Sequence, residues 1–293
     1  MDIINEDVPE LRKRKVEDIV LPTISNFLLV DECLLDARRV RVFREAIERT
    51  VKPGDVVVDA GTGTGIMALF AAKAGAQKVF AIELDPDIAQ VARKNVEVNH
   101  YDSVIEVVNQ DAATFMVNGK KSADVVIVEM LDTGLITENQ TRTIVGLRRN
   151  GVIDKYTDIL PERVSFKIRA IDYDFNFYGF SLPCIIQARN YGGRKKIRKI
   201  YSNLQSYAII EFRSLISRKL DAKVSLQINQ TGVVNAVELQ TDIYFGGKKY
   251  SSTSDMNMPV FIPIRERKVK QGKTLNLNIS YYMGDGFGNV KIV

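Results

Sequence analysis

The sequence predicts an α/β fold in two parts, a helix-covered parallel sheet followed by an antiparallel sheet. Between residues 56 and 128, short apolar runs alternate with helical segments, which is typical of a parallel sheet. Beyond residue 161, apolar and polar residues alternate with a period of two, as antiparallel strands with one buried face require. A chain of 293 residues with 45% hydrophobic content is long enough to bury one large core or two ordinary ones.

Composition excludes several classes of protein. The 41 basic residues are nearly balanced by 36 acidic ones, so the net charge of +5 says little about partners. Two distant cysteines, Cys33 and Cys184, and a single histidine, His100, argue against a metal site, a disulfide framework and a histidine-based triad. Residues 1–15 contain no apolar signal-peptide core, and no run of about 18 apolar residues follows. We therefore expect a soluble, cytoplasmic protein.

The first half begins with an amphipathic helix at 32–50, followed by a short buried strand at 56–58. The strand leads into the glycine-rich segment 59–65, and a helix is expected at 66–75. A strand, a glycine loop and a helix in this order can bind a nucleotide, because glycine lets a ligand approach the backbone and the helix N-terminus offers unpaired N–H groups. The same glycine pattern also occurs as a tight turn without a ligand.

Acidic residues at the ends of the next strands favour a ligand. A strand at 78–82 ends at Glu83, about 20 positions beyond the glycine loop, where a carboxylate can accept hydrogen bonds from both ribose hydroxyls. A helix then begins with Asp85 as its N-cap and Pro86 at its first position, and runs through Asn99. The segment therefore predicts a nucleoside site at the carboxyl edge of the sheet.

The choice between a dinucleotide and S-adenosylmethionine (SAM) depends on Asp59. This carboxylate stands two residues before Gly61, where it would repel a diphosphate but attract the cationic methionine end of SAM. Asp111 follows a strand expected at 105–108 and suits the exocyclic amine of adenine. A fourth strand is expected at 123–128. The composite pattern resembles that of the class I SAM-dependent methyltransferases.

Two glutamates after the fourth strand make the resemblance more specific. Glu129 and Glu138 have the spacing of the double-glutamate loop of the protein arginine methyltransferases (PRMTs), which the chain resembles over nearly its full length. Two carboxylates could clamp a guanidinium and orient one nitrogen for in-line methyl transfer. On spacing alone, Glu138 could equally be a solvated or helix-capping residue. Segment 35–47 resembles the PRMT helix before the glycine loop, with Arg39 at the position of an arginine that contacts the SAM carboxylate and the first glutamate.

The resemblance implies N-terminal helices and a Rossmann-like SAM-binding domain at 1–160, and a β-barrel-like domain at 161–293. A helical dimerisation arm is expected at about 173–201, which would make the protein a homodimer. The catalytic residues would be Glu129, Glu138 and Arg39. SAM, with S-adenosylhomocysteine as product, would be bound by Arg39, Asp59, Gly61, Thr62, Gly63, Gly65, Glu83, Leu84, Asp111, Ala112 and Glu129.

The sequence departs from the PRMT pattern on the substrate side. The family's threonine-histidine-tryptophan loop should fall near 255–258, yet that segment has neither histidine nor tryptophan. Met130 replaces the tryptophan after the first glutamate, and segment 22–27 lacks the expected tyrosine pair. The methyl acceptor is therefore open: protein arginine is favoured, and RNA is an alternative because of the basic clusters 12–15 and 194–199, although solvated faces explain such clusters more often. A SAM-binding homologue without turnover is a further alternative.

Overall fold

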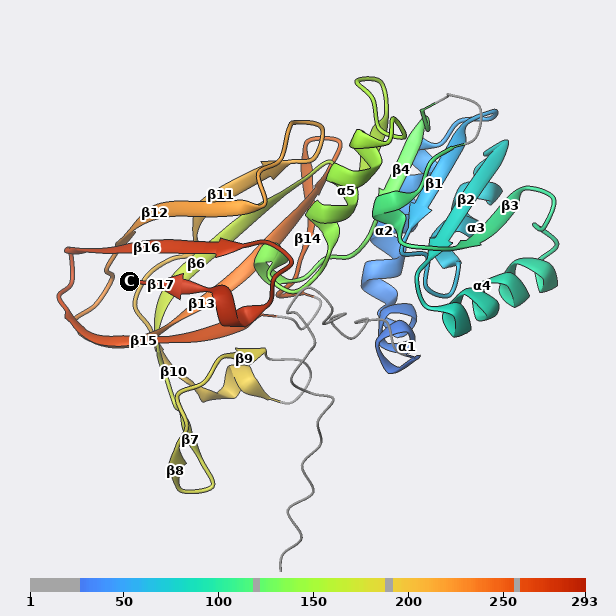
Figure 1. Cartoon of the computed structure of the whole chain (residues 1–293). Helices are drawn as coiled ribbons and strands as arrows, with labels where there is room; N and C mark the ends of the chain where they lie inside the picture. The colour runs from blue at the N-terminus through green and yellow to red at the C-terminus, as the bar shows by residue number, and fades with distance from the viewer. Residues whose placement is uncertain (1–26, 118–121, 188–191, 256–258) are drawn as a thin grey trace, which may run out of the picture.

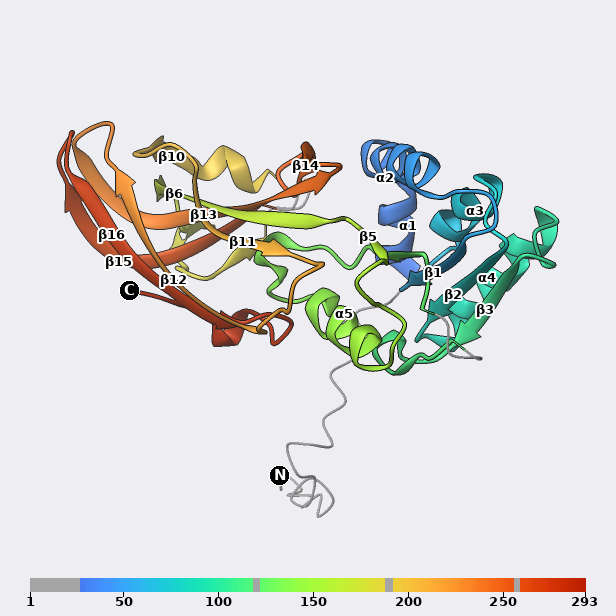
Figure 2. The same cartoon turned by 90° about the horizontal axis from the view of Figure 1, so that it is seen from above.

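The computed structural model describes residues 27–117, 122–187, 192–255 and 259–293. The chain forms two parts that lie side by side, a parallel sheet with its helices and a larger antiparallel region (Figures 1 and 2). The last parallel strand ends at Leu160 and the first long antiparallel strand begins at Arg163, on either side of the predicted boundary. No helix of the described residues is long and apolar enough to cross a membrane.

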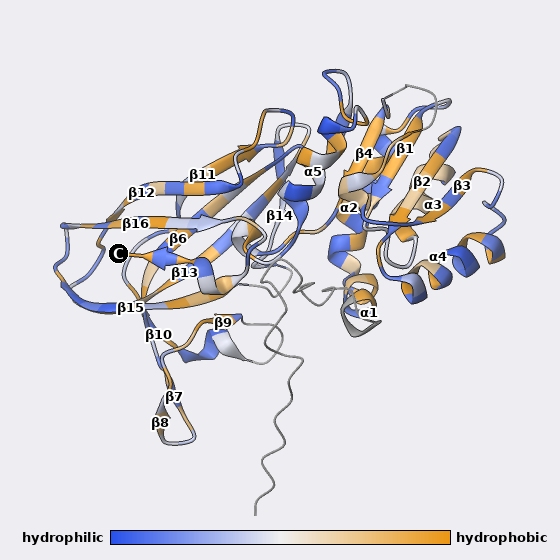
Figure 3. Ribbon diagram, in the orientation of Figure 1, coloured by the Kyte–Doolittle hydropathy of each residue, from blue (hydrophilic) through white to orange (hydrophobic). Residues whose placement is uncertain are grey.

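The parallel sheet has five strands in the order β3-β2-β1-β4-β5. Figure 3 shows β1, β2 and β4 as largely hydrophobic, which fits strands covered on both faces. The strand order places β1 at the centre with β4 beside it, so the segments that follow them meet at one edge of the sheet. The strands are β1 (Val56–Ala60), β2 (Lys78–Glu83), β3 (Ile105–Asn109), β4 (Val125–Val128) and β5 (Asp158–Leu160).

The helices cover both faces of this sheet. Figure 2 shows α2 and α3 on one face and α5 on the other. The prediction of a single helix at 32–50 is wrong, because the helix is interrupted at Asp36. The Asp36 side chain accepts a hydrogen bond from the backbone N–H of Arg39 and caps a new helix. Asp85 caps the helix that begins at Pro86, as predicted. The helices are α1 (Phe27–Leu35), α2 (Ala37–Thr50), α3 (Ile66–Lys73), α4 (Pro86–Val98) and α5 (Gln140–Arg149).

The second part is antiparallel, as the period-two patterns predict. Its larger sheet has the order β10-β6-β13-β15-β9, with β11 paired to β6 and β14 to β13; a smaller sheet has the order β12-β16-β17. Apolar side chains of both sheets contribute to one continuous core with the parallel part. The strands are β6 (Arg163–Tyr173), β9 (Ile186–Gln187), β10 (Ile197–Ile200), β11 (Gln205–Glu211), β12 (Lys219–Gln227), β13 (Gly232–Phe245), β14 (Lys248–Ser252), β15 (Val260–Val269), β16 (Thr274–Tyr282) and β17 (Lys291–Ile292).

The segment expected to be a helical arm is mostly extended in its described residues. Strands β7 (Asn176–Phe177) and β8 (Phe180–Ser181) form a hairpin that projects from the antiparallel part (Figure 1), and the helical content of this segment is the short 3-10 turn η5 (Gly193–Lys196). Tyr178 and Gly179 have φ values of 54° and 90° at the hairpin turn, which a helix cannot accommodate. The expectation of a helix here is corrected.

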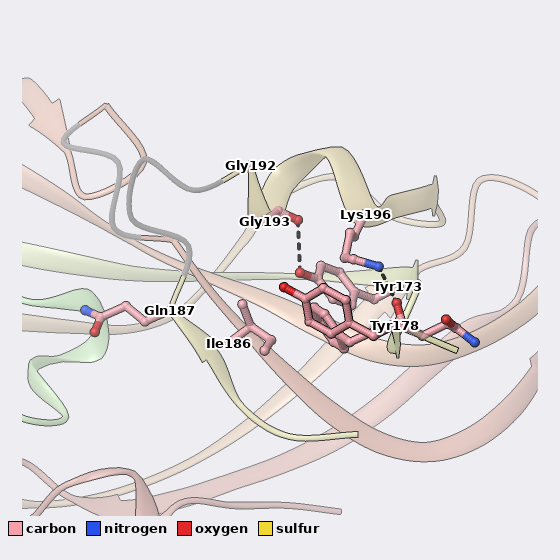
Figure 4. A pocket seen from close by; sticks show the side chains of 9 residues that line it. Tyr173, Tyr178, Ile186, Gln187, Gly192, Gly193 and Lys196 are labelled. Carbon is pink, nitrogen blue, oxygen red and sulfur yellow. Dashed lines mark hydrogen bonds between the residues drawn. The ribbon is translucent and has the colours of Figure 1, made fainter. Parts of the chain in front are cut away.

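A cavity of about 430 Å³ lies at the base of this hairpin (Figure 4). Tyr173, Tyr178 and Lys196 line it, and the Tyr173 hydroxyl donates a hydrogen bond of 3.0 Å to the carbonyl of Gly193. None of the residues predicted to bind SAM contributes to this cavity. The candidate SAM site therefore lies elsewhere, at the carboxyl edge of the parallel sheet.

Candidate active site

The glycine loop after β1 is held across the end of β2. The backbone N–H groups of Gly61 and Thr62 both donate to the carbonyl of Ile82 at 2.9 Å. Gly61, Gly63 and Gly65 have φ values of 78°, 55° and 85°, a conformation that other residues rarely adopt. The loop can therefore present its backbone at the sheet edge without side chains in the way.

Asp59 lies at the end of β1, directly before this loop. It is buried, with 1% of its surface exposed, and its carboxylate accepts a hydrogen bond of 2.6 Å from the Thr62 hydroxyl. Burial, with a smaller contribution from the nearby charge of Glu83, raises the pKa of Asp59 to about 6 despite the hydrogen bond from Thr62.

Glu83 ends β2 and holds the loop from the other side. One of its carboxylate oxygens accepts from the backbone N–H of Gly63 and the other from that of Asp85, both at 3.0 Å. Asp59 and Glu83 thus place two neighbouring carboxylates in a buried position, where they repel each other. A cationic ligand amine would relieve this repulsion, which fits the methionine end of SAM.

Asp111 and its neighbours lie at the end of β3. Asp111 caps the 3-10 turn η3 (Ala112–Thr114) and accepts a hydrogen bond of 2.5 Å from the Arg142 guanidinium. Although burial raises its pKa, hydrogen bonds from Arg142 and the Ala113 backbone outweigh burial and lower it. Arg142 was not foreseen, because an α5 residue has no sequence relation to β3.

Leu84 and Ala112 lie beside these carboxylates. The Leu84 side chain is 48% exposed, whereas Ala112 is buried. The side-chain amide of Asn109 donates to the carbonyls of Glu83 and Leu84, both at 2.9 Å, and thereby fixes the turn after β2. An apolar, partly exposed Leu84 next to a fixed turn is a suitable surface for an adenosine ring.

Arg39 and Glu129 form an ion pair between α2 and the segment after β4. Their side chains are 12% and 7% exposed, so the pair is largely desolvated. The Nε atom of Arg39 is buried and has no hydrogen-bond partner among the described residues. This orphaned donor fits the carboxylate of a methionine moiety, the group that the predicted SAM site requires.

The segment 129–138, which we call the acceptor loop, touches the glycine loop through Met130. A Cβ added to Gly61 would lie 3.3 Å from side-chain carbons of Met130. The buried side chain of Gln140 fixes the start of the acceptor loop, since it accepts from the Met130 N–H at 2.9 Å and donates to the Val128 carbonyl at 2.8 Å. Glu138 lies half-buried at the other end of the loop.

The middle of the acceptor loop is bonded to the antiparallel part by buried hydrogen bonds. The Thr133 hydroxyl donates to Thr253 at 2.7 Å, and the Gly134 N–H donates to the Thr241 hydroxyl at 2.7 Å. The Tyr281 hydroxyl donates to the Gly134 carbonyl at 2.8 Å. The start of the loop is thus held by the parallel part, and its middle by the antiparallel part.

Comparison with known proteins identifies the family of this chain. The family model for ribosomal protein L11 methyltransferase (PrmA) matches residues 42–150. An uncharacterised protein of Methanocaldococcus jannaschii is 31% identical over 260 residues, 88% of this chain and 93% of the relative. Protein arginine N-methyltransferase 1 of Oryza sativa subsp. indica is 32% identical over 180 residues, 57% of this chain and 46% of that protein. The chain belongs to the PRMT-like class I SAM-dependent methyltransferases.

Solved structures agree with this assignment at the level of the fold. The Trypanosoma brucei PRMT1 enzyme-prozyme complex with AdoHcy superposes with a TM-score of 0.72 at 18% identity, covering 87% of each chain. Arabidopsis thaliana protein arginine methyltransferase 10 gives a TM-score of 0.70 at 17% identity, covering 88% of each chain. The alignment to the rice PRMT spans about half of that curated relative. The predicted SAM cofactor and the predicted methyltransferase class are confirmed.

Some predictions for this methyltransferase lie outside the described residues. Positions 256–258, where the threonine-histidine-tryptophan loop was expected, and 22–26, most of the missing tyrosine segment, are among them. Among the described residues, no group of three or more His, Cys, Asp or Glu side chains is placed to hold a metal ion. Both cysteines are free, with Cys33 half-buried and Cys184 exposed.

Proposed function

We propose that this methyltransferase transfers the methyl group of SAM to a guanidinium-type nitrogen of a protein. The observation that carries the proposal is the Arg39–Glu129 pair, which joins the donor side of the site to the first acceptor glutamate and leaves the buried Arg39 Nε available. The curated PRMT relatives support protein arginine as the acceptor class.

Each predicted site residue has a role in this proposal. SAM supplies an electrophilic methyl group on a sulfonium centre, which leaves as the thioether of S-adenosylhomocysteine while the methylated nitrogen gives up one proton. Asp59 would attract the cationic methionine amine, Glu83 would accept hydrogen bonds from the ribose hydroxyls, and Arg39 would bind the methionine carboxylate. The glycine loop would present Gly61 to Gly65 to the same moiety, while Leu84, Asp111 and Ala112 would border adenine.

Glu129 and Glu138 would hold the acceptor. A guanidinium stays charged and offers a planar fork of donors, so two carboxylates can fix both its charge and its orientation. Fixing one nitrogen in line with the donor contributes through positioning, and the carboxylates stabilise the positive charge that the acceptor carries. Glu129, already oriented by Arg39, would set the geometry, and Glu138 would complete the clamp.

RNA remains the second candidate acceptor, because of one observation in the antiparallel part. Arg169, Arg194, Arg198 and Lys199 line an open cavity of about 580 Å³, where phosphates could bind. Arg198, however, already pairs with Asp174 at 2.7 Å, and Arg169 with the buried Glu238 at 2.6 Å. These pairs reduce the free positive charge, which favours protein as the acceptor.

A homodimer is part of the proposal. The hairpin β7–β8 exposes 99% of Tyr178 and 70% of Phe180, and Leu182 beside it is 49% exposed. Large apolar side chains on a projecting hairpin favour a protein contact. The cytoplasmic location and the domain boundary at residue 160 stay predictions from the sequence.

Transfer of labelled methyl groups tests the proposed function. SAM with a radiolabelled methyl group is incubated with the protein and an extract of the source organism, and the products are divided between ribonuclease and protease treatment. We expect label that resists ribonuclease, is lost with protease, and is absent with Glu129→Gln, although that variant still binds SAM. Glu106→Gln, an exposed glutamate on β3, is the matched control and keeps full transfer. Label that ribonuclease removes would assign RNA instead.

A further inference from the structure

The acceptor loop contains a third carboxylate, Asp132, that the proposed chemistry does not use. Only 3% of its surface is exposed, which is unusual for an aspartate. It lies between Glu129 and Glu138 in sequence, at the point where the loop turns into η4 (Thr133–Leu135). A buried charge in this position has a cost in desolvation that a neutral residue would avoid.

Asp132 is hydrogen-bonded to the residue that precedes Glu138. Its Oδ2 atom accepts two hydrogen bonds of 2.8 Å, one from the backbone N–H and one from the hydroxyl of Thr137, the residue directly before Glu138. Its Oδ1 atom is buried and has no hydrogen-bond partner among the described residues. One oxygen therefore closes the end of the loop, while the other stays buried without a hydrogen-bond partner.

Among the described residues, Asp132 forms no salt bridge with a cation. On its own loop Asp132 faces Glu138, which is also acidic. From the antiparallel part it faces Tyr207 on β11 and Tyr281 on β16, and its negative charge contributes to raising the pKa of both tyrosines. Burial raises the pKa of both tyrosines, so they stay neutral. Arg218, a cation near the Glu138 end of the loop, is already paired with Asp285.

We infer that Asp132 is a positioning residue of the acceptor site: it fixes Glu138 through Thr137, and its buried charge adds to the attraction that the two glutamates exert on a cationic acceptor. This inference rests on the proposed function, because it requires an acceptor that is positively charged. It assigns the acceptor loop three carboxylates where the pattern of glutamates alone assigns two.

The charge of Asp132 makes acceptor binding depend on pH. Burial, with a smaller contribution from the charge of Glu138, raises its pKa to about 7 despite hydrogen bonds from Thr137 and the Glu138 backbone. Below this value Asp132 is neutral, and above it the carboxylate is charged. A guanidinium keeps its charge throughout, so its affinity should rise with pH as Asp132 ionises.

Steady-state kinetics with the peptide acetyl-Gly-Arg-Gly-amide at saturating SAM test the inference between pH 6 and 8.5. For the wild type we expect the KM of the peptide to fall about fivefold as pH rises through about 7, with little change in kcat. Asp132→Asn keeps an acceptor for Thr137 but no charge, so its KM should be flat at the acid value of the wild type. Asp132→Ala also removes the acceptor, and its kcat should fall about tenfold.

Asp221→Asn provides the matched control, because Asp221 is an exposed aspartate on β12 that pairs with Lys219. Its KM profile should follow that of the wild type. An Asp132→Asn profile that still falls with pH would overturn the inference, as would an Asp132→Ala variant with unchanged kcat. If the wild type neither binds nor methylates the peptide at any pH, the proposed function fails first. Folding of each variant is followed by chemical denaturation, so that a loss of structure is recognised separately.

Discussion

The proposed site has a side for the methyl donor, with Asp59 and Glu83, and a side for the methyl acceptor, with Asp132 and Glu138. These donor and acceptor sides differ in how their carboxylates are held. On the donor side, Glu83 accepts hydrogen bonds from two backbone N–H groups, and Asp59 accepts one from the Thr62 hydroxyl. On the acceptor side, Asp132 leaves one buried oxygen without a partner, and Glu138 is only half-buried. The donor side is thus organised before any ligand arrives, whereas the acceptor side keeps negative charge that a cationic ligand can satisfy.

The largest expected effect concerns the donor side. Glu83→Gln removes the charge that holds the Gly63 and Asp85 N–H groups and that would accept the ribose hydroxyls. Because charge-assisted hydrogen bonds contribute about 1.5–3 kcal/mol each, we expect the Kd for SAM to rise about 100-fold. Calorimetric titration with SAM measures it, with Glu106→Gln as the control. A change below fivefold would mean that Glu83 only supports the loop.

An intermediate effect is expected where the two sides join. Gln140→Ala leaves the Met130 N–H and the Val128 carbonyl unpaired in a buried position. We expect the free energy of unfolding to fall by about 2–3 kcal/mol, and transfer to fall more than SAM binding. Chemical denaturation and a SAM titration measure the two effects. Gln205→Ala on β11, an exposed position, should change neither; equal losses of SAM binding and transfer would contradict the separation of the two sides.

The smallest expected effect is a pH dependence on the donor side. Since burial raises the pKa of Asp59 to about 6, its carboxylate is charged above that pH and neutral below it. The affinity for cationic SAM should therefore be highest above pH 6 and fall about tenfold toward pH 5, because one pKa unit corresponds to a tenfold change.

The stability of the free protein should change in the opposite direction. A raised folded-state pKa adds stability at low pH that is lost as pH rises from about 4 through 6. Asp59→Asn should show weak SAM binding without this pH dependence, as measured by titrations at each pH. A wild-type affinity that stays constant between pH 5 and 7 would show that Asp59 does not meet the positive charge of SAM.

Most of the fold could be predicted because its signals are local. Three consecutive valines before a glycine loop, and the Asp85–Pro86 start of α4, each specify their element within a few residues. The start of α2 at Asp36 could also have been predicted locally, because aspartate is a common N-cap. The hairpin β7–β8 was missed because the resemblance to a helical arm outweighed the turn residues around Gly179.

The site was predictable only in part, because some of its residues act through contacts between distant parts of the sequence. The carboxylates at strand ends follow from the pattern of the chain, because parallel strands bring their ends together. Gln140 and Arg142 act across the fold, on Met130 and Asp111, and nothing in their sequence surroundings marks them. Asp132 did carry a signal, an acid among the apolar residues of the acceptor loop, but its burial could only come from the structure.

The attachment of the acceptor loop has a mechanical consequence. Glu129 is fixed to the parallel sheet through β4 and Arg39, whereas the residues from Thr133 to Gly134 are fixed to β13 and to the segments around Thr253 and Tyr281. A rotation of the antiparallel part against the parallel sheet would therefore stretch or compress the loop between these anchors. The position of Thr133 and Gly134 relative to Glu129 would then follow the angle between the two parts.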